Sequence, residues 1–281
     1  KDVRIFLFMK KIIESVYKEF LEAYGTQGWW PLSGLDKPLS EEDKDWAGYI
    51  KFTGNEGTVE DFKKNWPRHL GFSPKNDRER FEIITGAILT QNTSWNNVER
   101  VLYNLNKHNL NSLDKMKIID TGELALLIKS AGYHNQKADR LKGLALYFSK
   151  SYKNLSDCFK EPLKNLRKEL LALKGIGPET ADSIILYAGE LPIFVIDAYT
   201  KRIFTRILGD YVKHDYDFWQ NLFMKQLDGE KNKVEVFKDY HGLIVKHGKE
   251  FCKTVPLCED CFLRNSCYTY LQNVDCKKYN L

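Results

Sequence analysis

One carboxylate follows an apolar run in the C-terminal half of the chain. Residues 192–196 read Pro-Ile-Phe-Val-Ile and lead directly to Asp197. An ionised carboxylate at the end of such a run is costly unless a partner stabilises it or a reaction uses it. We therefore expect Asp197 to be the N-cap of a helix over 198–208, a catalytic group, or both.

A glycine-containing turn precedes this carboxylate. The apolar spacing over 166–173 predicts a helix that stops at Gly175, and a second helix begins at Pro178. Because Gly175 and Gly177 have no side chains, their backbone can approach an anion such as a DNA phosphate. Both glycines, with Thr180 in the second helix, are candidate DNA contacts. The alternative is a plain turn between helices with a glycine C-cap.

Four of the six cysteines fall in one short segment. They are Cys252, Cys258, Cys261 and Cys267, with five, two and five residues between them. Thiols clustered in this way, in a chain expected to be intracellular, indicate one metal centre and not disulfides. A single C-x2-C pair with two outlying cysteines fits a four-thiolate [4Fe-4S] site better than zinc, whose sites more often use two such pairs or add His.

Composition indicates a soluble globular protein. The chain has 281 residues, of which 43% are hydrophobic, and no apolar run approaches the roughly twenty residues that span a bilayer. The formal net charge of +5 permits nucleic-acid binding without requiring it. The apolar run at 3–9 is too short for a secretory leader. Outside the cysteine cluster, we expect Cys158 in the core and Cys276 in the tail.

Apolar residues at three- and four-residue spacing predict an all-α fold. The expected helical ranges are 5–23, 79–106, 114–131, 136–150, 163–174, 179–188, 198–208, 216–227 and 233–248. The segment 25–78 differs, because it is rich in Gly, Pro, Trp and charge. It predicts a long ordered loop with one short helix, at 41–49 or at 59–65, whose tryptophans dock onto the helical body.

The segments LKGIGPETA and VIDAYTKR, with the cysteine cluster, resemble the endonuclease III family of helix-hairpin-helix (HhH-GPD) DNA glycosylases. The resemblance implies two helical lobes with a DNA-binding cleft between them. One is a helical barrel with the hairpin at 74–190; the other combines 1–73 and 191–281 and carries the cluster loop at 252–267. It also implies Asp197 as the catalytic residue and a [4Fe-4S] cluster on the four cysteines. The family's first cysteine gap is usually one residue longer, which keeps zinc as an alternative.

Two further segments match family loops that act on DNA. In AILTQNTSW, Gln91 aligns with the glutamine that fills the hole left by an extruded base. Its alternative role is that of an ordinary loop residue before a helix capped by Thr93 or Ser94. In AGYHNQKA, Tyr133 takes the place of the family's apolar wedge and could intercalate as the duplex bends. The alternative is an ordinary turn whose Tyr packs back on the barrel.

The hairpin holds Glu179 where bifunctional members of the family hold a lysine. That lysine forms a Schiff base with the sugar and leads to strand cleavage. A carboxylate cannot form one, so we expect lyase activity to be absent or weak. Asp197 would then stabilise an oxocarbenium-like sugar or orient a water during N-glycosidic hydrolysis. Lys249 is a nearby amine that we expect to bind a phosphate or to be solvated.

The QNTSW loop, the GWWP segment and the non-lysine hairpin position resemble 3-methyladenine DNA glycosylase III and other alkylpurine glycosylases. Trp95, Trp29 and Trp30 could surround a cationic alkylated purine, with Glu179 and Lys249 as further candidates for the pocket. Trp29 and Trp30 cannot both face one pocket from an extended segment, so we expect them to be mainly structural.

The expected function is that of a monofunctional DNA glycosylase that excises alkylated purines after base flipping. Two alternatives remain. One is a glycosylase of the same mechanism for uracil, mismatched or oxidised bases; the other is a non-enzymatic DNA-binding iron-sulfur protein. The expected partner is double-stranded DNA with a damaged base. We expect a monomer, without membrane association, in a prokaryotic cytoplasm near the nucleoid.

Overall fold

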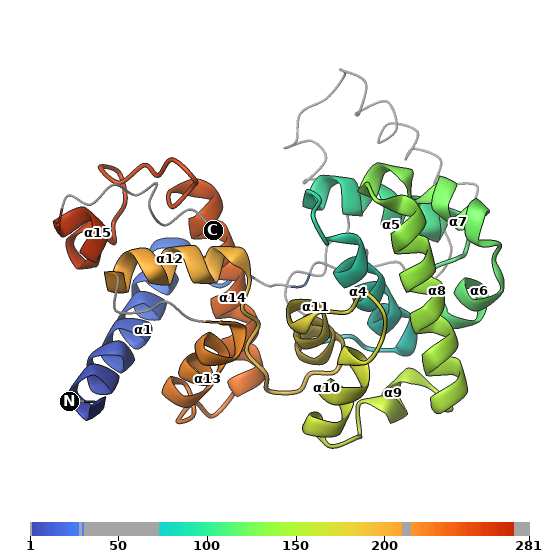
Figure 1. The fold of residues 1–281 in the computed structure, drawn as a ribbon, viewed down its shortest axis with the longest axis horizontal. Coiled ribbons are helices and arrows are strands. Elements are labelled where there is room, and N and C mark those ends of the chain that lie inside the picture. Colours follow the sequence, from blue (N-terminus) through green and yellow to red (C-terminus); the bar gives the residue numbers. More distant parts are fainter. Residues whose placement is uncertain (1, 28–29, 31–72, 210–214, 273–281) are drawn as a thin grey trace. The chain divides into compact units, whose positions relative to one another are not determined.

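Every regular element of the described residues is a helix (Figure 1). The computed structural model describes residues 2–27, 30, 73–209 and 215–272. The chain divides into two compact units, one made of Lys1–Trp29 with Glu190–Leu281 and the other of Trp30–Gly189. The prediction of an all-α fold is confirmed. No helix within the described ranges is long and apolar enough to cross a bilayer.

The Trp30–Gly189 unit is built around α4. Its elements are α4 (Asp77–Leu89), α5 (Trp95–Lys107), α6 (Leu113–Ile118), α7 (Thr121–Leu127), η2 (Lys129–Ala131), α8 (His134–Ser151), α9 (Leu155–Cys158), α10 (Leu163–Leu171), α11 (Pro178–Ser183) and the π-helical η3 (Ile184–Ala188). Side chains from Phe81 to Leu89 are buried, because α5, α8, α9 and η3 all pack against α4. Cys158 is fully buried, as predicted.

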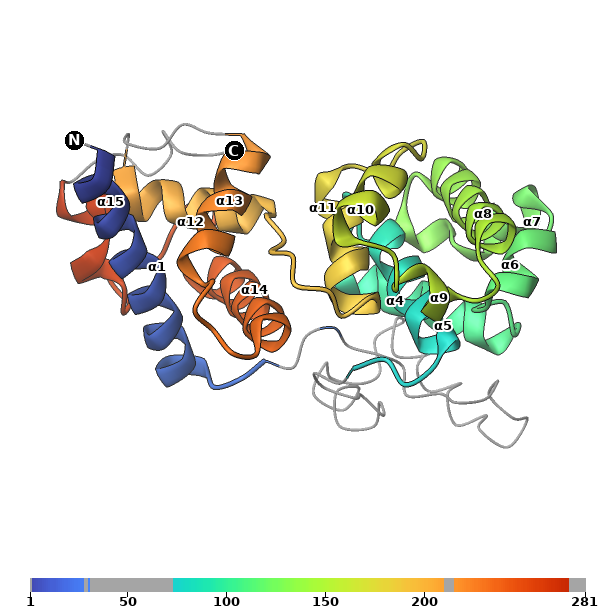
Figure 2. The same cartoon turned by 90° about the horizontal axis from the view of Figure 1, so that it is seen from below.

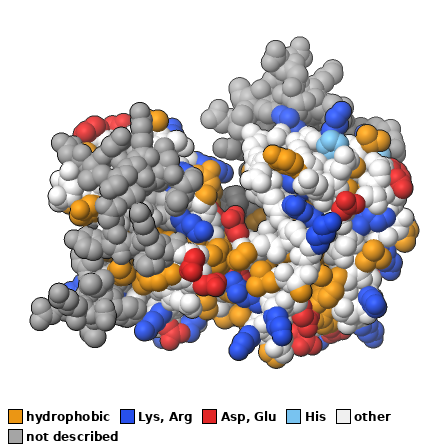
Figure 3. All heavy atoms as spheres, in the orientation of Figure 1, with side chains coloured by type: hydrophobic (Ala, Val, Ile, Leu, Met, Phe, Trp, Pro, Cys, Tyr) orange, Lys and Arg blue, Asp and Glu red, His pale blue; other side chains and the backbone are white. Residues whose placement is uncertain are grey.

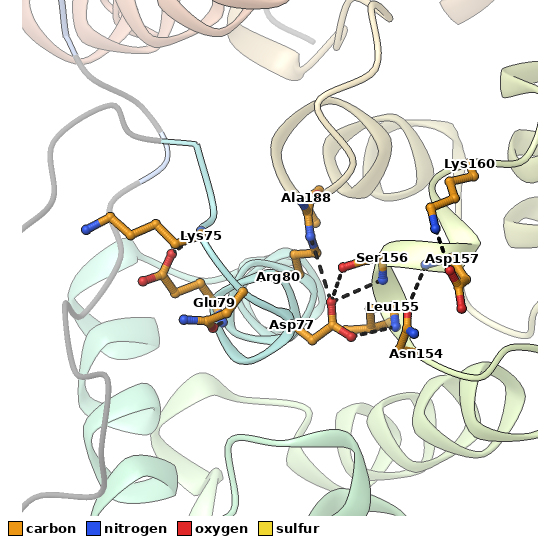
Figure 4. A network of polar contacts seen from close by, with 11 residues as sticks. Lys75, Asp77, Glu79, Arg80, Asn154, Leu155, Ser156, Asp157, Lys160 and Ala188 are labelled. Atoms are coloured by element: carbon orange, nitrogen blue, oxygen red, sulfur yellow. Dashed lines mark hydrogen bonds and ion pairs between the residues drawn. The ribbon is translucent and has the colours of Figure 1, made fainter.

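A polar network fixes the start of α4 (Figure 4). The Asp77 carboxylate accepts hydrogen bonds from the backbone amides of Leu155 at 2.9 Å and Ser156 at 3.1 Å, and also from the Ser156 hydroxyl. Arg80, one turn later, donates to the carbonyl oxygen of Ala188 at the end of η3. The beginning of α9 and the end of η3 are therefore both attached to one turn of α4.

The other unit contains α1 (Asp2–Tyr24), α12 (Ala198–Leu208), α13 (Tyr216–Gln226), α14 (Lys233–Glu250), η5 (Arg264–Ser266) and α15 (Tyr268–Leu271) (Figure 2). The apolar run before Asp197 belongs to its core: Phe194 stacks on Phe223 with ring centroids 4.4 Å apart. Tyr240 of α14 donates its hydroxyl to the carbonyl of Ile13 at 2.8 Å. These contacts join the run before α12 to α13, and α14 to α1.

Two expected helical stretches are interrupted. The stretch 79–106 divides at the polar loop 90–94 into α4 and α5. The expectation of one helix over 114–131 is wrong, because the Asp120 carboxylate accepts hydrogen bonds from the amides of Gly122 and Glu123. Satisfying those amides begins a new helix, α7, and separates it from α6.

Part of the sequence interpretation lies outside the described residues. This holds for most of the loop expected at 25–78, including its helix at 41–49 or 59–65. It also holds for Trp29 and for Cys276.

A bidentate ion pair joins the two helices of the hairpin. Arg167 of α10 contacts Asp182 of α11, with Nε 2.7 Å from Oδ1 and Nη2 3.1 Å from Oδ2. The Asp182 side chain is 0% exposed. Removing one partner of a buried ion pair is strongly destabilising, because the remaining charge stays out of water.

We expect Arg167→Met to lower the free energy of unfolding by about 3 kcal/mol, since Asp182 loses its guanidinium partner. Urea unfolding followed by circular dichroism measures this. Lys117→Met is the control, because Lys117 pairs at 2.6 Å with Asp114, whose side chain is 84% exposed, and exposed pairs contribute little. Equal effects of the two changes would contradict the assigned role.

Candidate active site and nucleic-acid interface

Asp197 lies at the start of α12 with 7% of its surface exposed. Its Oδ1 accepts hydrogen bonds from Thr200, at 2.6 Å from the backbone N and 2.7 Å from Oγ1. Its Oδ2 lies 3.5 Å from Nε2 of His241 on α14. The predicted N-cap role is confirmed, and one carboxylate oxygen is directed toward a histidine that the sequence did not single out.

Two opposing effects set the pKa of Asp197. Burial, the larger single effect, raises the pKa of the carboxyl. The hydrogen bond and charge interaction with His241, followed by the bonds from Thr200, together outweigh burial and hold the pKa below its ordinary value. Asp197 is therefore ionised at neutral pH. It can stabilise a developing positive charge or orient a water molecule, but it has no proton to donate.

The hairpin turn presents bare backbone to solvent. Gly175 has φ +82°, a left-handed conformation that favours glycine, and both Gly175 and Gly177 are exposed. A Cβ added at Gly177 would meet no atom within 4 Å, so an incoming group can approach the chain closely there. Thr180, in the first turn of α11, is 8% exposed. These features fit a phosphate contact at the turn.

Gln91 lies against this turn. Its Nε2 donates to Thr180 Oγ1 at 2.9 Å and to the Gly175 carbonyl at 3.2 Å. Arg140 of α8 donates to Gln91 Oε1. Ser94 occupies the N-cap position of α5 without a side-chain capping bond. Three segments far apart in the sequence therefore meet at the Gln91 amide.

Tyr133 lies at the tip of its loop. It has φ +46° and is 65% exposed, immediately before α8. The alternative in which this ring packs back on the helices is wrong. An exposed aromatic ring on a tight turn satisfies the steric requirement for insertion between bases.

A buried lysine binds the two helix ends that precede the loops carrying Gln91 and Tyr133. Lys137 of α8 is 0% exposed, and its Nζ donates to the carbonyls of Leu89 at 2.9 Å and Ala131 at 2.7 Å. Leu89 ends α4 and Ala131 ends η2, where a cation is favourable. Burial, together with the charge of Arg140, lowers the pKa of Lys137 to about 8. Sequence reasoning missed this residue, because a lysine on a helix is usually solvated.

The candidate pocket tryptophans differ in exposure. Trp30 is 5% exposed and packs against Trp95 and Tyr187, with ring centroids 5.3 Å and 5.2 Å away. Its ring lies over Gly86, where a Cβ would come within 2.9 Å of the indole. Trp95 is half-buried and donates Nε1 to Glu99 at 2.8 Å. Trp30 is thus part of the core, as expected of a mainly structural residue.

Glu179 and Lys249, the two remaining candidates for the substrate pocket, are solvent-accessible. Glu179 is exposed in the first turn of α11, where a negative charge is favourable. Lys249 is exposed in the last turn of α14, in the unit that also contains Asp197. On the face drawn in Figure 3, Lys and Arg side chains lie among Asp and Glu over both units.

All four cysteines of the C-terminal segment line one pocket. It holds about 410 Å³ of empty space, part of it open to solvent. Arg206, which is 2% exposed, donates to Cys252 Sγ at 3.3 Å and to two carbonyls of the following loop. His247 Nε2 lies 3.5 Å from Cys261 Sγ. Burial lowers the pKa of His247 to about 4 and raises the pKa of Cys261 to about 11.

The donor set of this pocket is four thiols with one nearby guanidinium. No set of three or more potential ligands among the described residues is placed to hold one ion. Four thiolates are ligands for either a zinc ion or an iron-sulfur cluster.

Comparison with known proteins gives a consistent result. A family model described as HhH-GPD superfamily base excision DNA repair protein matches residues 85–227. A Methanocaldococcus jannaschii protein, provisionally named DNA repair glycosylase MJ1434, is 36% identical over 261 residues, covering 92% of this chain and 96% of that protein.

Several solved structures are also similar. The H. pylori 3-methyladenine DNA glycosylase MagIII bound to 1,N6-ethenoadenine has a TM-score of 0.57 and 30% identity over 68% of this chain and 92% of that one. A thermostable thymine-DNA glycosylase has a TM-score of 0.56 and 23% identity, covering 69% and 86%. A trapped endonuclease III–DNA covalent intermediate has a TM-score of 0.57 and 17% identity, covering 84% and 99%. The last two show the similarity of fold alone.

We expect His241→Phe to raise the pKa of Asp197, because burial remains while the largest opposing contribution is lost. In the wild type, the ionised carboxylate stabilises the fold above the ordinary pKa of 3.8, and this contribution is lost as pH falls through the lower folded value. In the variant the loss begins at higher pH. A carbon-13 NMR titration of the Asp197 carboxyl measures the shift. The control, Glu250→Gln at an exposed site on α14, should leave the titration unchanged; an unchanged titration in His241→Phe would contradict the assignment.

Proposed function

Because the chain belongs to the HhH-GPD superfamily of base excision DNA repair proteins and is a DNA glycosylase of that family, we propose that it hydrolyses the N-glycosidic bond of alkylated purines of the 3-methyladenine type. The observation that carries the proposal is the ionised, buried Asp197 carboxylate with no described acid beside it other than His241. The substrate is double-stranded DNA containing the damaged base.

Asp197 acts on the sugar. As the base departs, positive charge develops on the anomeric carbon, and a carboxylate held out of bulk water stabilises that charge strongly. Thr200 occupies Oδ1 with two hydrogen bonds, so Oδ2 on the His241 side is the oxygen available to the reaction. The product is an abasic site.

Lyase chemistry lacks its nucleophile at the hairpin. Glu179 occupies the position of the Schiff-base lysine, and it is exposed in the first turn of α11. A carboxylate cannot condense with the sugar aldehyde. The reaction therefore ends at base removal.

The alkylpurine substrate is supported by the chemistry of the leaving base. A cationic N-alkylpurine leaves without a strong general acid, which fits a site with one carboxylate. The half-buried Trp95 indole, packed on Trp30, offers an electron-rich face to a cationic ring. The similar structure of the 3-methyladenine DNA glycosylase MagIII is bound to 1,N6-ethenoadenine.

Base release from methylated duplex DNA tests this proposal. We expect the wild type to release 3-methyladenine and to leave strand breaks only after alkali treatment. Asp197→Asn should lower the single-turnover rate at least 100-fold, since it removes the charge that acts in the transition state. Asp215→Asn is the matched control, because Asp215 is also a helix N-cap, bonded to the amide of Phe218 at 2.9 Å, and Asn retains capping.

The outcomes separate the alternatives. Release of uracil or mismatched thymine without release of 3-methyladenine would show that the excised base is neutral and would replace the alkylpurine proposal. Full activity of Asp197→Asn would refute the assigned mechanism.

A [4Fe-4S] cluster bound to Cys252, Cys258, Cys261 and Cys267 is part of the proposal. It is supported by the shared pocket of the four thiols and by the Arg206 contact with Cys252. The high pKa of Cys261 means that its thiol loses a proton when metal binds. The cluster would hold the loops around η5 and α15 together, and the reaction steps use the residues described above.

We expect Cys258→Ala to lose iron and acid-labile sulfide and to destabilise the C-terminal segment, so that DNA binding weakens. Iron and sulfide analysis, with thermal unfolding, measures both effects. Cys158→Ala is the control, because Cys158 is buried in the other unit and its loss should leave the iron content intact. A folded, tightly DNA-binding Cys258→Ala protein would contradict a structural cluster.

A further inference from the structure

Arg140 holds a charge that no carboxylate neutralises among the described residues. Its guanidinium is half-buried on α8, and its hydrogen-bond partner is the neutral Gln91 amide. Arg167, another half-buried arginine of this unit, is instead paired with the carboxylate of Asp182. A guanidinium bonded to a neutral acceptor binds an anionic oxygen more strongly when one becomes available.

The same guanidinium lies directly against the hairpin turn. A Cβ added at Gly175 would collide with Arg140, coming within 2.8 Å of Cδ and 2.9 Å of Cζ. Two features therefore favour glycine at position 175: its positive φ and the Arg140 side chain that packs against its α-carbon. A phosphate that meets the exposed backbone at Gly175 and Gly177 arrives beside a planar fork of donors suited to its geometry.

Gln91 is held by the groups that the phosphate would meet. Its Nε2 donates to the Gly175 carbonyl and to Thr180 Oγ1 of the hairpin, and its Oε1 accepts from Arg140 of α8, so both polar atoms of the side chain are engaged. In this position Gln91 cannot enter a duplex. Filling the hole left by an extruded base requires these bonds to break.

We propose that Arg140 exchanges its partner on DNA docking, leaving Gln91 for a backbone phosphate at the hairpin and thereby removing one of the three bonds that hold Gln91 away from the duplex. The inference rests on the proposed function in one respect, namely that the hairpin docks on duplex DNA. Arg140 is a phosphate ligand and a positioning residue for Gln91. Docking and release are coupled through Nη1, because the donor that bonds Gln91 Oε1 is weakened when it turns to a phosphate oxygen.

Salt dependence of binding tests the phosphate contact. The probe is a duplex with an uncleavable tetrahydrofuran abasic analogue, with affinity followed by fluorescence anisotropy between 50 and 200 mM salt. Arg140→Met should reduce the slope of log affinity against log salt by about 0.9, so a fourfold rise in salt weakens binding about 3.5-fold less than in the wild type. Arg140→Lys should retain the slope. Lys150→Met, an exposed charge loss on the same helix, should retain it as well.

Binding to undamaged duplex tests the exchange. Gln91→Ala removes the competitor for Arg140, so it should strengthen binding to undamaged duplex, and this gain should vanish in the Arg140→Met background. A slope unchanged by Arg140→Met would overturn the phosphate contact. A Gln91→Ala effect equal in both backgrounds would overturn the exchange. These experiments measure binding and not base release, so a negative result here leaves the proposed alkylpurine substrate untouched. A wild-type protein that binds no duplex would overturn both the Arg140 exchange and the proposed function.

Discussion

The burial of one ionised carboxylate is the constraint on which the chemistry of this protein depends. Taking Asp197 out of water opposes its ionised form, and the compensation comes from two sources. Thr200 is local, since an N-cap always places the third helical residue within reach. His241 is remote and reaches Asp197 only because α12 packs against α14. The rings of Phe204 on α12 and Tyr240 on α14, with centroids 6.3 Å apart, are part of that packing.

In the Trp30–Gly189 unit, polar contacts hold the loops that carry the proposed DNA-binding residues. The contacts are made by cationic side chains that pack against backbone carbonyls and against a glycine. Lys137 ties the ends of α4 and η2 from below, and Arg140 lies on Gly175 while it holds Gln91. The ion pair between Arg167 and Asp182 fixes the two hairpin helices to each other.

The cysteine pocket brings four thiols and the guanidinium of Arg206 together. One C-x2-C pair with outlying cysteines is compatible with zinc or with an iron-sulfur cluster. The same arginine bonds the carbonyls of Lys253 and Thr254, so it orders the loop that carries the cysteines.

The sequence by itself determined what depends on neighbours along the chain. Helical periodicity predicted the all-α fold, the apolar run predicted Asp197 as an N-cap, and the glycine turn with Pro178 predicted the start of α11; local hydrogen bonds and backbone preferences decide these features. Only the tertiary structure decided which side chains from distant helices contact these residues. His241 for Asp197, Arg140 for Gln91 and the burial of Lys137 have no signal in spacing, because they depend on which helix faces meet. A lysine or histidine on a helix looks the same in sequence whether water or another helix covers it.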